Sequence, residues 1–360
     1  MARIAIVSDV HLGTRQYGLK ERYEDFLESF RRFGKSARDV DAVVIGGDLF
    51  DSPRPDARSV LTAQMVVNMI KSEGTVVFGI DGNHDLSGGD WLSVVGAEPL
   101  PDCTPYDYWS IKIVGMNYRS GRDFVDAIKQ MVDRGVKADI LVAHFALAEM
   151  NGGGSADTGV QELCPLLEKM GVKCVLMGHV HIPEARKWNG ILFVNPGSTE
   201  LKSSNEPREK FYFVVETETW EAVEVPLITR EVVDNEVTCE ADVEKLRECL
   251  SDEMKLEGKL EIRPFHQIIA DDSIEDVYKR IAAIVHDTGA IARIVTRSNH
   301  ARDVAPSVDR RQESVTTLES AIEARFPKDS DEARLVLSML RSPDPSSVHL
   351  ICEKFMKGEK

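Results

Sequence analysis

Five short polar segments most constrain how this chain of 360 residues can fold, because each directly follows an apolar run typical of a buried β-strand. In chain order, the segments are Asp9-Val10-His11, Gly46-Gly47-Asp48, Gly82-Asn83-His84-Asp85, His144 and Gly178-His179-Val180-His181. The runs that precede them cover residues 4–7, 42–45, 75–80, 140–143 and 172–177. Residues just past the ends of parallel strands share one edge of a sheet, so we expect the five segments to converge.

The stretches between these runs predict helices. Residues 23–33, 60–71 and 124–134 carry apolar side chains at the spacing of an amphipathic helix, and residues 191–194 form a further apolar run. Alternating strands and helices predict an α/β fold for this part of the chain.

The residue types in the five segments favour a metal site. Carboxylate, amide oxygen and imidazole together suit manganese, iron or zinc, whereas calcium and magnesium prefer shells made only of oxygen. Two such ions that share a carboxylate can activate water and stabilise an in-line displacement at phosphorus. A single histidine at a strand end is more often a hydrogen-bonded structural residue. The ordered series of five is far more specific, and it predicts hydrolysis of a phosphoester.

Composition limits the partners of the chain. A net charge of −16 argues against binding nucleic acid through bulk positive charge alone, although an acidic protein without such a partner explains the charge equally well. The sequence has neither a long apolar run nor a signal-peptide pattern, so we expect no membrane partner and a cytoplasmic location. Six cysteines without CxxC spacing indicate reduced thiols.

The order and residue types of the five segments resemble those of the calcineurin-like metallophosphoesterase superfamily over roughly residues 1–230. The resemblance implies an α/β fold of two packed mixed β-sheets flanked by helices. The ligands that it implies are Asp9, His11, Asp48 and His181 for one divalent ion, and Asp48, Asn83, His144 and His179 for the other. It also implies that His84 protonates the leaving oxygen and that Asp85 orients the His84 ring.

Residues around these ligands resemble a narrower group, the SbcD/Mre-type nucleases of DNA double-strand-break repair. The matching residues are Asp9 to Gly13 with Tyr17, Arg22, Asp25 and Phe26, then Gly47 to Asp51, Arg54-Pro55 and Asn195 to Glu200. Members of this group use manganese to cut DNA, as 3′ to 5′ exonucleases on duplex ends and as endonucleases on single strands or hairpins. The resemblance implies the same activity here, with a nucleoid-associated location if the source is prokaryotic.

Position 51 is a point of variation within that group. Several archaeal and eukaryotic members carry histidine there, whereas bacterial-type members resemble this chain in having aspartate. Asp51 would repel phosphate unless it orients Arg54 or a metal ligand, so the balance of exonuclease and endonuclease activity stays open. The DNA contacts that the resemblance favours are Arg15, Tyr17 and Arg54. Other basic residues near the motif loops, Arg22 among them, could touch phosphates, but a solvated surface charge is the simpler explanation.

The composition changes after about residue 230. We expect a nuclease domain at 1–230, a smaller α+β cap or DNA-binding domain at 231–298, a polar linker at 299–316 and a helical tail at 317–360. Within the cap, residues 260–263 and 290–295 are candidate strands and residues 273–286 a candidate helix. The tail either docks to an SbcC-type coiled-coil ABC ATPase, as the resemblance suggests, or packs on the cap. The helix at 60–71 has more apolar positions than one buried stripe needs, which predicts a homodimer.

Two other functions fit the same residues. A small-molecule or nucleotide phosphodiesterase or phosphatase would use the same metals, but it has no need of the linker and tail. A catalytically silent scaffold would keep the fold for partner binding. Such scaffolds usually lose metal ligands, and here the expected set is complete.

Overall fold

A computed structural model describes residues 2–86, 90–150, 154–255 and 262–297. The expected linker and helical tail therefore lie outside the described residues. The strands are β1 (Arg3–Val7), β2 (Ala42–Ile45), β3 (Val76–Gly79), β4 (Glu98–Pro99), β5 (Pro105–Tyr108), β6 (Ile111–Met116), β7 (Ile140–His144), β8 (Cys174–Gly178), β9 (Glu184–Trp188), β10 (Ile191–Asn195), β11 (Lys210–Glu216), β12 (Glu221–Leu227), β13 (Val232–Val237), β14 (Phe265–Asp271) and β15 (Ile291–Arg297). The α-helices are α1 (Lys20–Ser36), α2 (Ala57–Ser72), α3 (Trp91–Val95), α4 (Gly121–Asp133), α5 (Val160–Met170), α6 (Glu240–Lys255) and α7 (Val277–Thr288), with short 3-10 helices at Gln16–Gly18 and Ala148–Met150.

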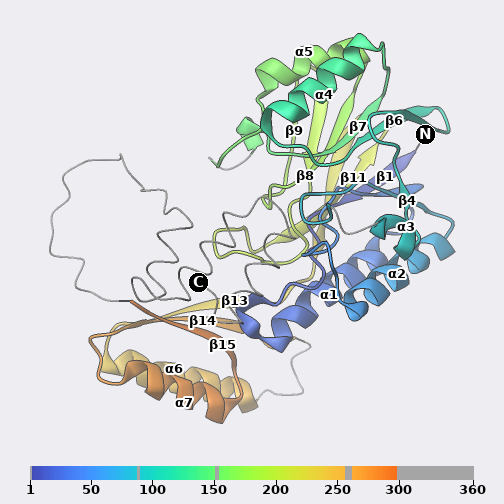
Figure 1. Cartoon of the computed structure of the whole chain (residues 1–360). Helices are drawn as coiled ribbons and strands as arrows, with labels where there is room; N and C mark the ends of the chain where they lie inside the picture. Colours follow the sequence, from blue (N-terminus) through green and yellow to red (C-terminus); the bar gives the residue numbers. More distant parts are fainter. Residues whose placement is uncertain (1, 87–89, 151–153, 256–261, 298–360) are drawn as a thin grey trace, which may run out of the picture. The chain divides into compact units, whose positions relative to one another are not determined.

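Two mixed six-stranded sheets form the larger part of the described chain. Their strand orders are β12-β11-β1-β2-β3-β4 and β5-β6-β7-β8-β10-β9. Strands β1 to β4 run parallel to one another, as do β6, β7, β8 and β10, and the antiparallel strands lie at the outer positions. Figure 1 shows α1 and α2 beside the first sheet and α4 and α5 beside the second.

The two sheets pack face to face, and this explains why inner strands such as β2, β7 and β8 are apolar along their length. In β1, Ile4 and Ile6 belong to the core between the sheets, whereas Ala5 and Val7 belong to the core under α1 and α2. Strands buried on both faces have no position for polar side chains except at their ends. The expectation of two mixed sheets flanked by helices is confirmed.

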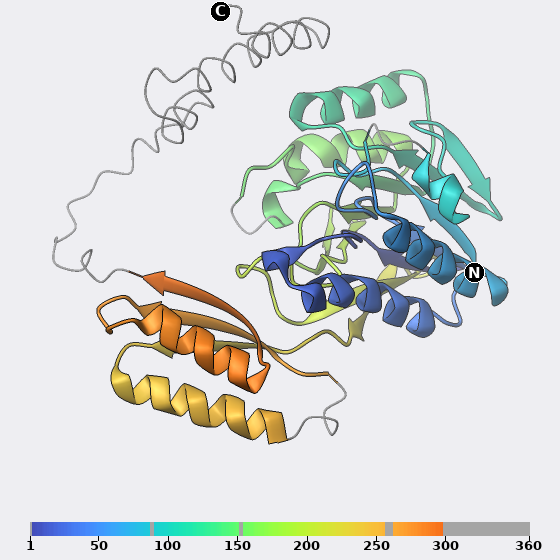
Figure 2. The ribbon, with the colours of Figure 1, turned by 60° about the horizontal axis from the view of Figure 1, so that its bottom comes forward.

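A third sheet of three parallel strands, β13-β14-β15, follows, and α6 and α7 lie side by side on one of its faces (Figure 2). The expected smaller α+β part is therefore confirmed. The position of one strand was wrong: Ile262 and Arg263 are not in a strand, and the central strand is instead β14, Phe265–Asp271. The β14 sequence buries alternate residues such as Ile268 and Ala270 under the helices, which gives it the better strand pattern.

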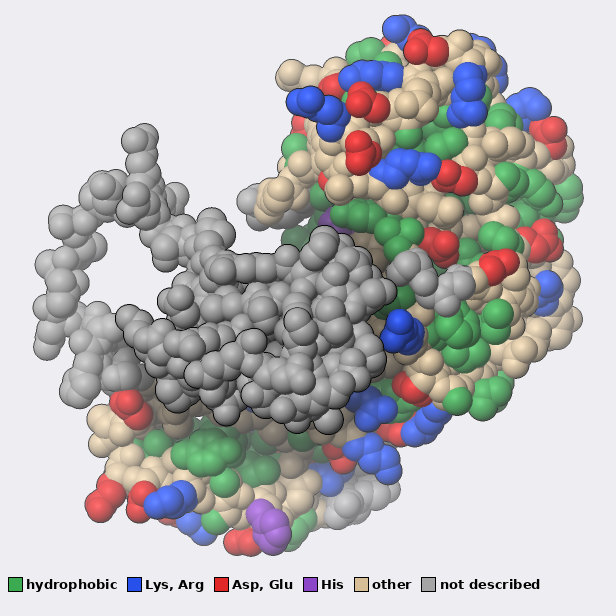
Figure 3. All heavy atoms as spheres, viewed as in Figure 1, with side chains coloured by type: hydrophobic (Ala, Val, Ile, Leu, Met, Phe, Trp, Pro, Cys, Tyr) green, Lys and Arg blue, Asp and Glu red, His purple; other side chains and the backbone are tan. Residues whose placement is uncertain are grey.

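Neither acidic nor basic side chains predominate on the surface over α4 and α5. On the face that Figure 3 shows, acidic and basic side chains are interspersed there. Within the described residues, no helix is both long and apolar enough to cross a bilayer.

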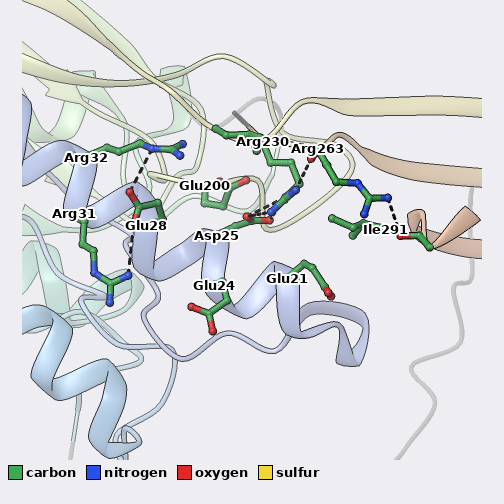
Figure 4. Close-up of a pocket in the computed structure, with 12 residues that line it drawn as sticks. Glu21, Glu24, Asp25, Glu28, Arg31, Arg32, Glu200, Arg230, Arg263 and Ile291 are labelled. Carbon is green, nitrogen blue, oxygen red and sulfur yellow. Dashed lines mark hydrogen bonds and ion pairs between the residues drawn. The ribbon is translucent and has the colours of Figure 1, made fainter. Parts of the chain in front are cut away.

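A buried arginine ties α1 to the loop after β10. Arg22 is fully buried, and its guanidinium donates to Asp25 Oδ2 at 2.7 Å and to the Leu201 carbonyl at 2.7 Å. Glu200 Oε1 lies 3.2 Å away and completes the charge compensation. Both oxygens of Asp25 also accept from Arg230, the residue that leads into the third sheet (Figure 4). Arg22 is therefore an internal structural residue and is not available to DNA phosphates.

Arg22→Ala is expected to lower the free energy of unfolding by about 3–5 kcal/mol, because it leaves the buried Glu200 carboxylate without its cation. Urea unfolding of the full chain measures this. Arg38→Ala is the matched control, since the Arg38 side chain is 62% exposed and its nearest Glu73 oxygen is 3.9 Å away. That exposed pair should contribute at most about 1 kcal/mol. Equal losses in the two variants would contradict the structural role of Arg22.

Candidate metal centre

The five polar segments meet where the parallel strands of both sheets end. Asp9 and His11 follow β1, Asp48 follows β2, Asn83 follows β3, and His144 is the last residue of β7. The segment with His179 and His181 follows β8. Contacts across the two sheets confirm the convergence: the backbone N–H of His179 donates to Asp9 Oδ2 at 3.0 Å, and His144 Nδ1 lies 2.8 Å from the Gly46 carbonyl oxygen.

One group of donor atoms is formed by Asp9, His11, His181 and Asp48. The Nε2 atoms of His11 and His181 face each other at 3.1 Å. Asp9 Oδ1 lies 3.4 Å from His181 Nε2, and Asp48 Oδ2 lies 3.7 Å from His11 Nε2. Asp9, His11 and His181 each offer a donor atom within 4.8 Å of the others, and Asp48 approaches this cluster beside His11, which is the arrangement of a cation site.

A second group lies beside the first and shares Asp48 with it. Asn83 Oδ1 is 3.2 Å from His144 Nε2 and 3.0 Å from His179 Nδ1. Asp48 Oδ2 is 3.5 Å from His144 Nε2, so the same oxygen that approaches His11 also approaches this group. Asp48 therefore stands where a bridging ligand between two ions would stand.

The electrostatics of the two groups fit divalent cations. Burial opposes charge on His144 and His181, but hydrogen bonds and charges from Asp48, Asp9 and Glu206 raise the pKa of each to about 9. Burial also works against ionised Asp9, yet His181 and the other histidines lower the pKa of this carboxyl. Without metal, the raised pKa values favour protonated His144 and His181 beside the buried carboxylates, whereas burial lowers the pKa of His11 and His179. A bound cation would replace those protons, so the residues fit the divalent metals that the resemblance implies.

The backbone at these positions is strained. Asp9, His11 and Asp48 have φ values of 52°, 49° and 51°, and His179 has 94°, all in the left-handed region that side-chain-bearing residues avoid. Such conformations cost on the order of 1–3 kcal/mol each and persist where the surrounding fold imposes them. Gly82 is needed for a related reason, because a Cβ there would collide with the Asp48 side chain and backbone.

Two further carboxylates contact the outer nitrogens of two candidate ligands, His11 and His181. Asp51 Oδ1 lies 3.4 Å from His11 Nδ1 and 2.7 Å from Lys202 Nζ. Of the two roles considered for Asp51, the structure thus favours orienting a metal ligand over orienting Arg54. Glu206 Oε1 lies 2.7 Å from His181 Nδ1, and no sequence argument singled it out. Its only signal is an acidic residue in the polar stretch after Glu200.

His84 and Asp85 are placed differently from each other. The His84 Nδ1 atom lies 2.8 Å from the backbone oxygen of Asp51, and its Nε2 is 4.0 Å from Asp48 Oδ2, so this histidine borders the site. The Asp85 carboxylate instead accepts the backbone N–H groups of Leu49, Phe50 and Gly82. The expectation that Asp85 orients the His84 ring was wrong; the Asp51 carbonyl does so.

Asp85 supports two of the loops that carry candidate ligands. It joins the loop after β2 to the loop after β3, which hold Asp48 and Asn83. Burial and the nearby charge of Asp48 raise the pKa of Asp85 to about 7.

The three residues expected to contact DNA lie outside the two groups of donor atoms. Arg15 and Arg54 are exposed, and the Arg15 guanidinium lies over the Tyr23 ring at 5.3 Å. Tyr17 is 37% exposed, but its ring stacks on Phe265 with centroids 5.7 Å apart, and Arg293 lies over it at 4.3 Å. Stacking of Tyr17 on a base would compete with these contacts.

A cavity of about 280 Å³ opens beside the two groups. The residues that line it are Ala146, Gly154, Ser155, His179, Val180, His181, Ile182, Asn205 and Glu206. Because His179 and His181 form part of its wall, a substrate in this cavity would lie next to the two groups of donor atoms.

Comparison with known proteins shows the family of the chain. The model of the calcineurin-like phosphoesterase family matches residues 2–183, and the chain belongs to this family. The chain is 28% identical to the DNA double-strand break repair protein Mre11 of Haloferax volcanii, over 96% of this chain and 84% of that protein. It is 26% identical to the protein of the same name from Archaeoglobus fulgidus, over 55% of this chain and 50% of that protein. A crystal structure of a Thermus thermophilus protein matches with a TM-score of 0.44 and 14% identity, over 62% of this chain and 98% of that chain.

Proposed function

We propose that this member of the metallophosphoesterase family is a manganese-dependent DNA nuclease that processes ends at double-strand breaks. It would act as a 3′ to 5′ exonuclease on duplex DNA and as an endonuclease on single strands. The observation that carries the proposal is the pair of donor groups that share Asp48, supported by the similarity to Mre11 proteins over nearly the whole chain.

In this proposal, Asp9, His11, Asp48 and His181 hold one ion, and Asp48, Asn83, His144 and His179 hold the other. When bound, the two ions would supply a nucleophilic water and charge stabilisation at phosphorus. The chain supplies the rest of the chemistry. Asp48 fixes the two groups relative to each other, and the strained loops hold the donor atoms in place before substrate arrives.

His84 is the proposed acid for the leaving oxygen. The Asp51 carbonyl can only accept, so His84 Nδ1 carries a hydrogen and Nε2 is the atom left to exchange a proton with substrate. The His84 side chain is 36% exposed, which leaves it accessible from outside the site. Asp51 would modulate the activity through His11, which it contacts at 3.4 Å.

DNA contacts and domains complete the proposal. Arg15, Tyr17 and Arg54 would contact the strand, in a nuclease domain of residues 1–230 followed by a cap at 231–298. The tail at 317–360, which follows the linker at 299–316, would dock an SbcC-type coiled-coil ABC ATPase, in the cytoplasm or at the nucleoid.

The test is an assay with Mn²⁺ on a 5′-labelled duplex, on circular single-stranded DNA and on bis-p-nitrophenyl phosphate. The proposal expects a ladder of products that shorten from the 3′ end, nicking of the circle, and hydrolysis of the small diester. Hydrolysis of the small diester with both DNAs intact would contradict it and would point to a small-molecule phosphodiesterase.

A homodimer through α2 is part of the proposal. Val66 and Ile70 on this helix are buried, whereas Leu61 and Met65, one turn apart, are 58% and 60% exposed. Combining Leu61→Glu with Met65→Glu should weaken dimerisation by at least about 100-fold, because each buried apolar side chain contributes roughly 1.5–3 kcal/mol. Light scattering at micromolar concentration measures the change. Val223→Glu, at a position 57% exposed on β12, is the control. A monomeric wild type would contradict this prediction.

A further inference from the structure

A buried lysine and a partly buried glutamate, whose side chain is 7% exposed, lie behind the group of donor atoms that contains His181. Lys210, the first residue of β11, is 1% exposed, and its Nζ atom donates to Glu206 Oε2 at 2.7 Å and to Ser198 Oγ at 2.8 Å. Neither residue takes part in the function proposed above. Removing such a pair from water has a desolvation cost that often exceeds its Coulombic gain, so stability alone is a weak reason for its presence.

The two oxygens of Glu206 have separate partners. Oε2 receives Lys210 Nζ and the backbone N–H of Lys202 at 3.2 Å, and the Ser198 hydroxyl lies 2.9 Å from it. Oε1 faces His181 Nδ1 at 2.7 Å. The first set of contacts fixes the carboxylate, and the second oxygen is left to hold the histidine.

This arrangement determines which nitrogen of His181 carries a hydrogen. An ionised carboxylate can only accept, so Nδ1 must donate to Glu206. Nε2 is then the atom available to a metal ion, and it points toward Asp9 Oδ1 and His11 Nε2. The other ligand histidines are held differently: His144 Nδ1 faces a neutral carbonyl, and His11 Nδ1 has Lys202 Nζ at 2.9 Å beside Asp51.

We propose that Glu206, fixed by Lys210, is a positioning residue that sets the ring orientation and tautomer of His181 and thereby tightens the first of the two metal sites. The inference rests on the proposed function, because it takes His181 to be a metal ligand. A carboxylate behind a ligand histidine also makes the histidine more basic, and loss of such partners typically weakens metal binding about 10- to 100-fold.

The test is calorimetric titration of the metal-free full chain with Mn²⁺ alone. Wild type should bind two ions, and Glu206→Gln should bind one of them about 10- to 100-fold more weakly while the other is retained. The control is Glu253→Gln. Glu253 Oε2 lies 2.6 Å from Nε2 of the buried His266 in the third sheet, so this variant removes a similar carboxylate–histidine hydrogen bond far from the ligands in sequence. The control should bind both ions as wild type does.

Glu206→Asp keeps the negative charge beside Lys210 but withdraws the oxygen from His181. It should weaken the same ion, and it decides the question if Glu206→Gln does not fold by circular dichroism. Both Glu206 variants binding two ions within about twofold of wild type would overturn the inference, as would an equal loss in Glu253→Gln. A wild type that binds two Mn²⁺ but cuts no DNA would refute the nuclease proposal and leave this inference standing. A wild type that binds no Mn²⁺ would refute both.

Discussion

Asp48→Ala is expected to lower the rate of phosphodiester hydrolysis by at least about a thousandfold. One Asp48 oxygen approaches histidines of both donor groups, at 3.7 Å from His11 and 3.5 Å from His144. Its loss would remove the bridge between the two ions, which contribute several kcal/mol to the transition state, and each 1.36 kcal/mol corresponds to tenfold in rate. The measurement is kcat/KM on bis-p-nitrophenyl phosphate with saturating Mn²⁺.

Asp85→Asn is an informative companion to that variant. Asp85 joins the same loops through backbone N–H groups but has no place among the donor atoms of the described residues. We therefore expect Asp85→Asn mainly to lower the free energy of unfolding and to change the number of bound Mn²⁺ ions less.

An Asp48→Ala protein that keeps more than about a tenth of the wild-type rate would contradict the bridging role.

His84→Gln is expected to lower DNA cleavage by about 10²- to 10⁴-fold while both Mn²⁺ ions remain bound, because glutamine cannot transfer a proton to the leaving oxygen. Its amide can still donate to the Asp51 carbonyl, so the local structure should be kept. The measurement pairs single-turnover DNA cleavage with Mn²⁺ stoichiometry by calorimetry.

The choice of substrate separates the acid role of His84 from a positioning role. The p-nitrophenolate leaving group is a stable anion that needs little protonation, whereas the alkoxide released from DNA needs it. The loss in His84→Gln should therefore be much smaller on bis-p-nitrophenyl phosphate than on DNA. Equal losses on the two substrates would indicate that His84 positions substrate and does not act as an acid.

The convergence of the donor atoms could be predicted from sequence because it depends on strand ends alone. The runs before Asp9, Asp48 and His144 are short and apolar on both faces, and such strands place the residues that follow them at a common edge. The residue types at those strand ends, which are the types that bind metals, are then read directly from the sequence. That the strands divide into two facing sheets was implied only by the family resemblance, since an apolar run does not specify its partner.

Contacts between side chains distant in sequence could not be predicted. Glu206 lies in a stretch that resembles an ordinary polar loop, and only the fold brings it to His181. Asp85 follows His84 in sequence, yet the turn directs its carboxylate to backbone N–H groups of another loop. Tyr17 has the character of an exposed stacking residue, but Phe265 of the third sheet meets it. Such errors arise because adjacency in sequence does not determine side-chain direction in a tight turn.

The central claim is that seven side chains from five segments hold two divalent ions that share Asp48. Crystals grown with MnCl₂ and measured for anomalous scattering test it most directly. We expect two manganese peaks about 3.5–4 Å apart. One peak should lie among Asp9, His11 and His181, the other among Asn83, His144 and His179, with Asp48 contacting both. A single peak, or manganese bound away from Asp48, would contradict the account.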